Sequence, residues 1–443
     1  MAPTFLVTAA DEYTGFKLCH YILQLLATGT PYDELALEVD ASLREVALYA
    51  AVGDPNGPLA QTLARYGATL VASDPETGRL LDEAALAGMD YVLIVPSARL
   101  IRTSPAARTI KACRQAGVRN VLLWSSICNQ QTNTQFLSQY RRLETVLRET
   151  LAPTDADPAP TNWAIVRAGW YMEYLYLHQR PLQAEARLEL PFRTGYIAPV
   201  RLRDLAMALL HVMHDMSRTL AYHRTFNFTG PDLLTGHLMG QIASHALRTP
   251  VELAHTTLEA TAEFLRDQAL VWCPYGKAAA DPGFVSTPRV TGAGGPISTR
   301  RVTTSFGASS DSSDVSPLPS PVQRPMTGVQ PWPIRTTPAD LGTNVAYPDQ
   351  LPSPFRLEAG HAASPTEGTA LVKPDDLPIT HPVRLVSTHE VDVLTELYEM
   401  ARLSRLDLLT GDLAAVLGRR PETLATFLHK KRRDFLGGVT TSP

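Results

Sequence analysis

The first segment whose residue types suit ligand binding is the turn after the first apolar run, Phe5-Leu6-Val7. In parallel sheets that bind nucleotides, such a strand-to-helix turn places backbone N–H groups and a helix N-terminus against a pyrophosphate. Only Gly15 remains of the three glycines that usually allow this approach, and Asp11 and Glu12 bring negative charge to the place of the phosphates. A turn that binds nothing is therefore the alternative interpretation. The candidate cofactor-binding residues here are Thr8, Ala9, Ala10, Thr14, Gly15 and Phe16.

Other chemical signatures in the sequence are weak. His211 and His214 lie three residues apart on an expected helix, but no third ligand is spaced to complete a metal site. The sequence contains neither a nucleophile elbow nor a Walker loop. The four cysteines are far apart without a C-x-x-C motif, which argues against a disulfide framework and against a cysteine zinc site. We therefore expect no metal.

The segments around the first turn alternate between strand and helix patterns. Expected strands cover 4–7, 46–52, 69–72, 91–95, 120–125 and 163–167, and expected helices cover 15–26, 59–66, 80–87, 106–116 and 133–150. Near-continuous apolar strands separated by single helices indicate a parallel sheet that is covered on both faces. Right-handed crossovers then produce a doubly wound, Rossmann-type α/β fold.

The rest of the chain has a different character. We expect the Rossmann-type domain over 1–200 and a smaller, mainly helical C-terminal region, which begins over 201–274 and resumes over 381–443. Between these two parts, residues 275–380 are rich in Pro, Ser and Thr and show little apolar periodicity, which predicts a disordered insert. The insert holds much of the surplus among 35 prolines in 443 residues, where about 5% is usual.

Charge and hydropathy limit the partners. With 40 basic and 44 acidic residues the net charge is −4, so no field over the whole molecule attracts nucleic acid or anionic lipid. No apolar run approaches the roughly 18 residues of a membrane span. We expect a soluble cytoplasmic protein that binds no membrane and no nucleic acid directly. The basic run from His429 to Arg433 either complements a helix C-terminal dipole or serves as a nuclear import signal, so a nuclear location is the alternative.

Several segments, in their order and spacing, resemble one known family. They are Val7-Thr8-Ala9-Ala10, Ala51-Val52-Gly53-Asp54-Pro55, the run from Gly67 to Asp74, Trp124-Ser125-Ser126 and the run from Ala164 to Glu173. Over about 1–270 and 385–436, the chain resembles NmrA-like atypical short-chain dehydrogenases. The resemblance implies a Rossmann domain with NAD(P) at the carboxyl edge of the sheet, near Asp74 and Ser97. The family includes reductases of quinones or other small carbonyl and alkene substrates, and non-catalytic regulators that sense dinucleotide redox state and bind a transcription factor.

The chain departs from the conventional dehydrogenase pattern at its proton-transfer residues. Those enzymes use Tyr-x-x-x-Lys, in which the lysine lowers the tyrosine pKa and holds the nicotinamide ribose. Here Tyr140 is followed four residues later by Glu144, so the pair is missing. Tyr140 is either a proton donor or a core aromatic on an apolar helical face. Ser125 lies where the family places groups near the nicotinamide, and it is either catalytic or a structural strand end.

The end of the second strand bears on the choice of cofactor. Family members that prefer NADP commonly have arginine where this chain has Gly53, because guanidinium pairs with the 2′-phosphate. The glycine favours NAD over NADP. Asp54 is a candidate ribose ligand, although Gly53-Asp54-Pro55 also suits an ordinary turn.

Together these features predict an NmrA-like, dinucleotide-linked regulatory protein, non-catalytic or weakly catalytic, that acts through a protein partner such as a transcription factor. One alternative is an NAD(P)H-dependent reductase of a small-molecule substrate, with Tyr140 as proton donor. The other is a scaffold that no longer binds nucleotide.

Overall fold

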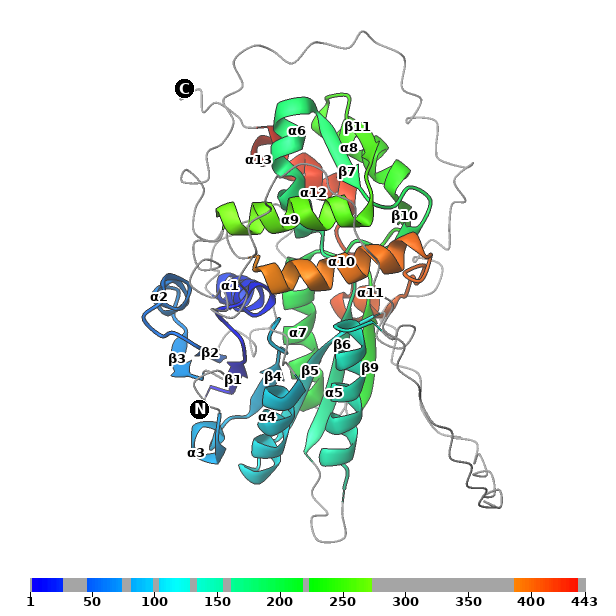
Figure 1. Ribbon diagram of the computed structural model, residues 1–443. Coiled ribbons are helices and arrows are strands. Elements are labelled where there is room, and N and C mark those ends of the chain that lie inside the picture. The colour runs from blue at the N-terminus through cyan, green and yellow to red at the C-terminus, as the bar shows by residue number, and fades with distance from the viewer. Residues whose placement is uncertain are drawn as a thin grey trace, which may run out of the picture.

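The computed structural model describes residues 2–26, 46–73, 81–98, 103–127, 134–153, 161–217, 223–272 and 386–436. Its main sheet has seven parallel strands in the order β3-β2-β1-β4-β5-β6-β9 (Figure 1). The first six follow the Rossmann order, which confirms the expected doubly wound α/β fold. The strands are β1 (Thr4–Val7), β2 (Ala47–Val52), β3 (Thr69–Ala72), β4 (Tyr91–Ile94), β5 (Asn120–Ser126), β6 (Asn162–Ala168) and β9 (Arg224–Phe228).

Helices cover both faces of this sheet. Because successive strand residues point to opposite faces, Phe5 and Val7 pack in one core cluster and Leu6 packs in the other. The first cluster includes α1 (Tyr13–Leu26), α2 (Pro58–Arg65) and α7 (Leu202–Ser217). The second includes α3 (Glu83–Leu86), α4 (Thr103–Gln115) and α5 (Leu137–Thr150). The sequence predicted helices α1 to α5 in this order, although α3 is shorter and α5 begins later than expected.

The sheet does not end at residue 200. Strand β9 pairs with β6, and α7 packs against α1, although both lie in the range that the sequence analysis gave to the C-terminal region. After the insert, Asp412 returns to this part of the molecule, where its Oδ2 accepts a hydrogen bond from Asn227 N of β9 at 2.8 Å. The region after 200 therefore contributes both to the sheet and to the smaller lobe.

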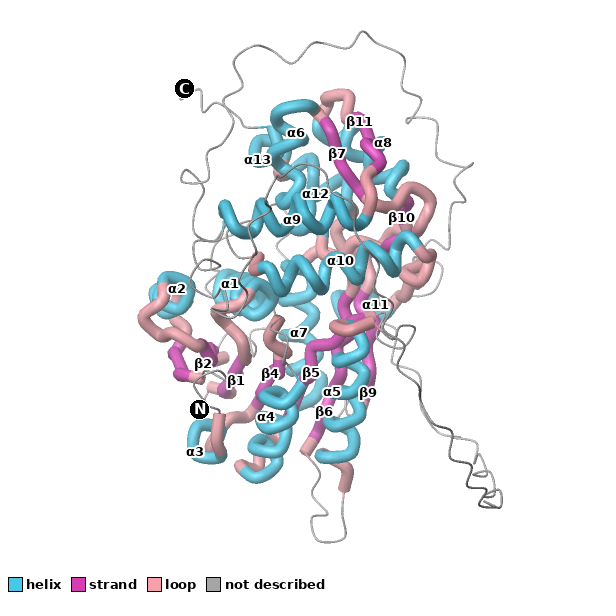
Figure 2. Tube along the Cα trace, viewed as in Figure 1, coloured by secondary structure: helices cyan, strands magenta, loops and turns pink. Residues whose placement is uncertain are grey.

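The smaller lobe is mostly helical, as expected, and stands above the carboxyl edge of the sheet (Figure 2). It also holds two short strand pairs that the sequence did not predict: β7 with β11 in parallel, and β8 with β10 antiparallel. Its strands are β7 (Arg187–Leu190), β8 (Tyr196–Ile197), β10 (Leu234–Thr235) and β11 (Glu252–His255). Its helices are the 3₁₀ helix η2 (Met172–His178), α6 (Gln179–Glu185), α8 (Gly236–Leu247), α9 (Leu258–Trp272), α10 (Thr388–Arg402), α12 (Leu424–Lys430) and α13 (Arg432–Leu436). Helix α11 (Asp412–Leu417) instead packs against α7 and β9.

The disordered insert predicted over 275–380 lies outside the described residues. The helices on either side of it pack against each other, since Arg266 Nη2 of α9 lies 2.8 Å from Asp392 Oδ1 of α10. Figure 1 shows α10 crossing above the upper ends of β4, β5 and β6. Among the described segments, no helix combines the length and apolarity needed to cross a membrane.

Candidate functional site

The turn between β1 and α1 has a Rossmann-type geometry built around a single glycine. Ala9 adopts a left-handed conformation with φ of +48°, which is uncommon for a residue other than glycine. A Cβ atom on Gly15 would lie 2.1 Å from the carbonyl oxygen of Ala9. Gly15 is therefore required for the first turn of α1 to pack against the end of β1, which is the role of the last glycine in dinucleotide-binding turns.

The other candidate residues of this turn are committed to local structure. Thr8 Oγ1 accepts from Val95 N at 2.9 Å and donates to Val95 O at 3.0 Å, which ties β1 to the end of β4. Ala10 is buried, and Phe16 is buried against His20. Thr14 is buried beside the hydroxyl of Tyr171, with which it shares a hydrogen bond. The structure thus gathers the predicted residues in one turn, and their role in cofactor binding stays a prediction.

Asp11 bridges this turn to the end of β2. Its Oδ2 accepts hydrogen bonds from Gly53 N at 2.8 Å and from Asp54 N at 3.4 Å. Asp54 itself is exposed, and its Oδ1 accepts from Asn56 N at 2.9 Å, which is the pattern of a self-contained Asx turn. Asp74, the other acidic candidate for this side of the cofactor, lies outside the described residues.

Glu12 bridges the same turn to the segment after β4. Its Oε1 accepts from Ser97 Oγ at 2.5 Å, and its Oε2 accepts from Ala98 N at 2.6 Å. Glu12 immediately precedes Tyr13, the first residue of α1, so its carboxylate is at the helix N-terminus. A pyrophosphate at this turn would need the N–H and O–H donors that surround it. Here the carboxylates of Asp11 and Glu12 already accept from these donors and bring negative charge.

Glu144, one turn after Tyr140 on α5, forms a buried polar group with Ser125 and Arg167. Glu144 is 1% exposed and accepts hydrogen bonds from Arg167 Nε at 2.8 Å, Arg167 Nη2 at 2.6 Å and Ser125 Oγ at 2.7 Å. A further bond, from Arg148 Nη2 at 3.2 Å, comes from one turn along α5. Glu144 therefore joins α5 to β5 and β6, four residues after Tyr140, where the Tyr-x-x-x-Lys pattern would have a lysine.

Tyr140 is half-buried on α5 and packs against the larger core cluster, one turn before Glu144. Tyr140 also affects Tyr171, whose pKa is raised first by burial and then by the charges of Tyr140 and Glu390. The Tyr171 hydroxyl also accepts a hydrogen bond from Trp124 Nε1 at 3.1 Å. The sequence placed Tyr140 at the site but gave no sign of Tyr171, except that it lies in the segment that carries the family resemblance.

Tyr171 belongs to a stack of three buried tyrosines at the carboxyl edge of the sheet. The ring centroids are 5.5 Å apart for Tyr13 and Tyr174 and 5.0 Å apart for Tyr171 and Tyr174. Burial is the main cause that raises the pKa of all three phenols, with a smaller contribution from the charge of Glu390. At neutral pH these phenols are uncharged, so they act as packing groups, and the hydroxyls of Tyr171 and Tyr174 also form hydrogen bonds.

Helix α10 supplies two carboxylates to this edge from beyond the insert. Glu390 Oε1 accepts from Tyr174 Oη at 2.9 Å. Glu396 caps the start of α5, since its two oxygens accept from Phe136 N at 2.9 and 3.0 Å and from Leu137 N at 2.8 Å. This cap accounts for the position at which α5 begins. Helix α10 is therefore fixed to the part of the sheet where parallel α/β proteins bind ligands.

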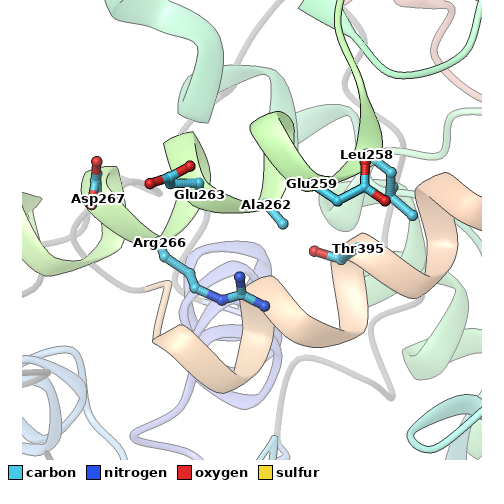
Figure 3. Close-up of a pocket in the computed structure, with 7 residues that line it drawn as sticks. All are labelled: Leu258, Glu259, Ala262, Glu263, Arg266, Asp267 and Thr395. Carbon is cyan, nitrogen blue, oxygen red and sulfur yellow. The ribbon is translucent and has the colours of Figure 1, made fainter. Parts of the chain in front are cut away.

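A cavity of about 630 Å³ lies between α9 and α10, away from the predicted site residues. Figure 3 shows the side chains of α9 and one of α10 around it. The lining contains three carboxylates and one guanidinium, and its residues are Leu258, Glu259, Ala262, Glu263, Arg266, Asp267 and Thr395. None of the residues that the sequence singled out lies in this cavity.

The metal and import predictions rest on other residues. Within the described segments, no group of three or more His, Cys, Asp or Glu side chains is placed to hold a metal ion. In the basic run, Lys430 Nζ lies 3.7 Å from Glu422 Oε1, and Arg432 Nε donates to Leu247 O at 2.8 Å. These contacts give the basic residues a structural role at the ends of α12 and α13, and nuclear import stays a prediction.

Comparison with known proteins shows that the chain shares its fold with several solved structures. No family model matches the chain, and no curated protein does. A nucleoside-diphosphate-sugar epimerase structure from Staphylococcus aureus matches with a TM-score of 0.52 at 13% identity, covering 96% of this chain and 99% of that chain. An NADPH-dependent quinone oxidoreductase from Escherichia coli matches with a TM-score of 0.49 at 15% identity, covering 96% and 98%. NmrA, a negative transcriptional regulator solved in complex with NAD, matches with a TM-score of 0.45 at 15% identity, covering 58% and 74%.

At these identities the likeness concerns the fold. The match to the epimerase extends over nearly the whole of both chains, so the smaller lobe is part of the likeness together with the parallel sheet. It agrees with the strand order and with the geometry of the first turn. The chain therefore has the Rossmann-type fold that its resemblance to the NmrA-like family implied.

Proposed function

We propose that the protein is a non-catalytic regulator on a Rossmann-type scaffold, which acts through contacts with a protein partner such as a transcription factor. The observation that carries the proposal is the buried pair of Glu144 and Arg167, with Ser125 bonded to the same carboxylate. In a conventional short-chain dehydrogenase, a lysine ammonium at the position of Glu144 would promote proton transfer by a tyrosine. Here that position holds a carboxylate whose bonds are directed into the protein.

A carboxylate cannot replace the lysine in this role. Negative charge near a phenol disfavours the phenolate and raises the tyrosine pKa, whereas the lysine of a dehydrogenase lowers it. The three stacked tyrosines at the same edge also have raised pKa values, chiefly because they are buried. An acid or base that works near neutral pH needs a pKa near the working pH. The described residues at this edge do not supply one through a tyrosine–lysine pair.

The contacts of α10 favour a structural use of the same edge. Glu390 bonds to Tyr174, and Glu396 caps α5, so the chain that follows the insert is held to the carboxyl edge of the sheet by two carboxylates. We also propose that a dinucleotide acts as a weakly bound effector, and that NAD(H) binds more tightly than NADP(H). Gly53 lacks the guanidinium that would pair with a 2′-phosphate, and Asp11 adds negative charge beside it.

Two measurements on the purified full chain test this function. Calorimetric titration with NAD, NADH, NADP and NADPH measures the affinity for each, and an assay of NADH and NADPH oxidation with a panel of quinones measures turnover. We expect no turnover above that of Tyr140→Phe. Turnover that this variant abolishes would refute the regulator and support the reductase. Full-length protein that binds none of the four dinucleotides would instead support the scaffold that has lost its nucleotide.

A further inference from the structure

We propose that the carboxylates of Asp11 and Glu12 are built-in competitors of the phosphates of a dinucleotide, and that they set its affinity and the choice between NAD(H) and NADP(H). The inference deepens the proposed function and rests on it, because it assigns the weak response of a regulator to two residues. Their bonds to the loops after β2 and β4 carry it.

Asp11 lies on the ribose side of the turn. The N–H groups of Gly53 and Asp54 follow β2, and they point at Asp11 Oδ2 over 2.8 and 3.4 Å. In Rossmann folds the residues that follow this strand bind the adenosine ribose or its 2′-phosphate. The Asp11 carboxylate therefore satisfies donors that could face the ligand, and it places a negative charge beside the 2′ position.

Glu12 lies on the pyrophosphate side. Its carboxylate is at the N-terminus of α1, where the helix dipole favours an anion, and where Rossmann proteins place the pyrophosphate. Its two oxygens accept from Ser97 Oγ at 2.5 Å and from Ala98 N at 2.6 Å, so they connect the turn to the segment after β4. A ligand phosphate at this place would have to displace the carboxylate or lie next to it.

The two carboxylates should affect the four dinucleotides differently. The pyrophosphate is common to all of them, so the Glu12 carboxylate should weaken the binding of all four by similar factors. The 2′-phosphate occurs only in NADP and NADPH, so the Asp11 carboxylate should weaken the binding of those two more than the binding of NAD and NADH. The affinity pattern therefore separates the contributions of the two side chains.

The test measures the dissociation constants of all four dinucleotides for the full chain and for the neutral variants Asp11→Asn and Glu12→Gln. Asp11→Asn keeps an oxygen that can accept from Gly53 N and Asp54 N. Glu12→Gln keeps an oxygen that can accept from Ala98 N, and its amide N–H can donate to Ser97 Oγ, which favours retention of the turn. We expect Glu12→Gln to tighten all four dinucleotides by tenfold or more, which corresponds to about 1.4 kcal/mol. Asp11→Asn should tighten NADP and NADPH at least fivefold more than NAD and NADH. The control, Glu149→Gln, removes an exposed carboxylate near the far end of α5 and should change no affinity by more than twofold.

Several results would overturn the proposal. Dissociation constants within twofold of those of the parent chain, in both variants, would overturn it. A parent chain that binds NADPH as tightly as NADH would also overturn it. Variants that bind no dinucleotide would do so too, provided that their melting curves match the parent's. If Glu12→Gln does not fold, Glu12→Ser serves at the same place, because serine is a favoured residue before a helix. Turnover does not enter this test, so failure here is distinct from failure of the proposed function.

Discussion

The replacement Arg167→Met probes the buried group that takes the place of the dehydrogenase lysine. Arg167 donates two charge-assisted bonds to Glu144, of 2.8 and 2.6 Å, and the glutamate is 1% exposed. Removing one partner of a buried ion pair costs about 3–5 kcal/mol, because the other charge is left without compensation. Ser125 and Arg148 still bond to Glu144 in this variant, so we expect the lower end, about 3 kcal/mol.

The matched control removes a different partner of the same carboxylate. Arg148 lies 3.2 Å from Glu144, but its side chain is 39% exposed, so Arg148→Met should cost less than about 1 kcal/mol. The free energy of unfolding from urea titration measures both variants. The double variant Glu144→Gln with Arg167→Met should lose less than Arg167→Met alone, since no uncompensated charge remains. If Arg167→Met costs no more than Arg148→Met, the buried pair does not hold α5 to the sheet as described.

Three further predictions concern the turn, the lobe and the cap. Gly15→Ala should lower the free energy of unfolding by about 3 kcal/mol or more in melting experiments, because its methyl group would lie 2.1 Å from Ala9 O. The control Gly411→Ala should be nearly neutral, because its methyl group would meet nothing within 4 Å. Burial lowers the pKa of His178 from 6.5 to about 4, so its contribution to stability is complete above pH 6.5 and is lost as the pH falls towards 4. At pH 5 this loss is about 2 kcal/mol, and His178→Gln should lack it when melting is compared at pH 7 and pH 5. Glu396→Ala should lower the free energy of unfolding by about 2 kcal/mol and should speed amide hydrogen exchange only at the start of α5. Exchange there at the same rate as in the parent chain would refute the capping role of Glu396.

The main sheet could be predicted because its strands carry their own signal. Strand β5 (Asn120–Ser126) is buried at every position, so its sequence is an almost continuous apolar run. The pairs β7 with β11 and β8 with β10 could not be predicted, because two to four residues are too few to establish a period. The place of strand β9 in the main sheet could not be predicted either, because it depends on pairing with β6, about 60 residues earlier in the chain.

At the site, the sequence identified the residue types but not the groups to which their side chains bond. It showed that Asp11 and Glu12 bring charge to the first turn, and that Glu144 replaces a lysine. Their partners could not be found by periodicity, because Gly53 lies 42 residues from Asp11 and Ala98 lies 86 residues from Glu12. Such contacts are set by the order of the strands in the sheet, which brings the ends of β2, β1 and β4 together.

Some of the residues that the sequence missed bond to each other across the insert. Glu390 bonds to Tyr174 from 216 residues away, and Glu396 caps α5 from about 260 residues away. On the sequence alone they are two acids on an amphipathic helix, a pattern that usually indicates a solvated face. The tyrosine stack around Tyr174 likewise joins α1 to the segment after β6.

The central claim is that this Rossmann-type chain lacks the proton-transfer pair of a dehydrogenase. The most direct measurement is the rate of NADH and NADPH oxidation by a panel of quinones at saturating cofactor, with the parent chain and with Tyr140→Phe side by side. The account predicts that the two rates do not differ and that neither exceeds the rate without protein. Turnover by the parent chain that Tyr140→Phe abolishes would contradict it.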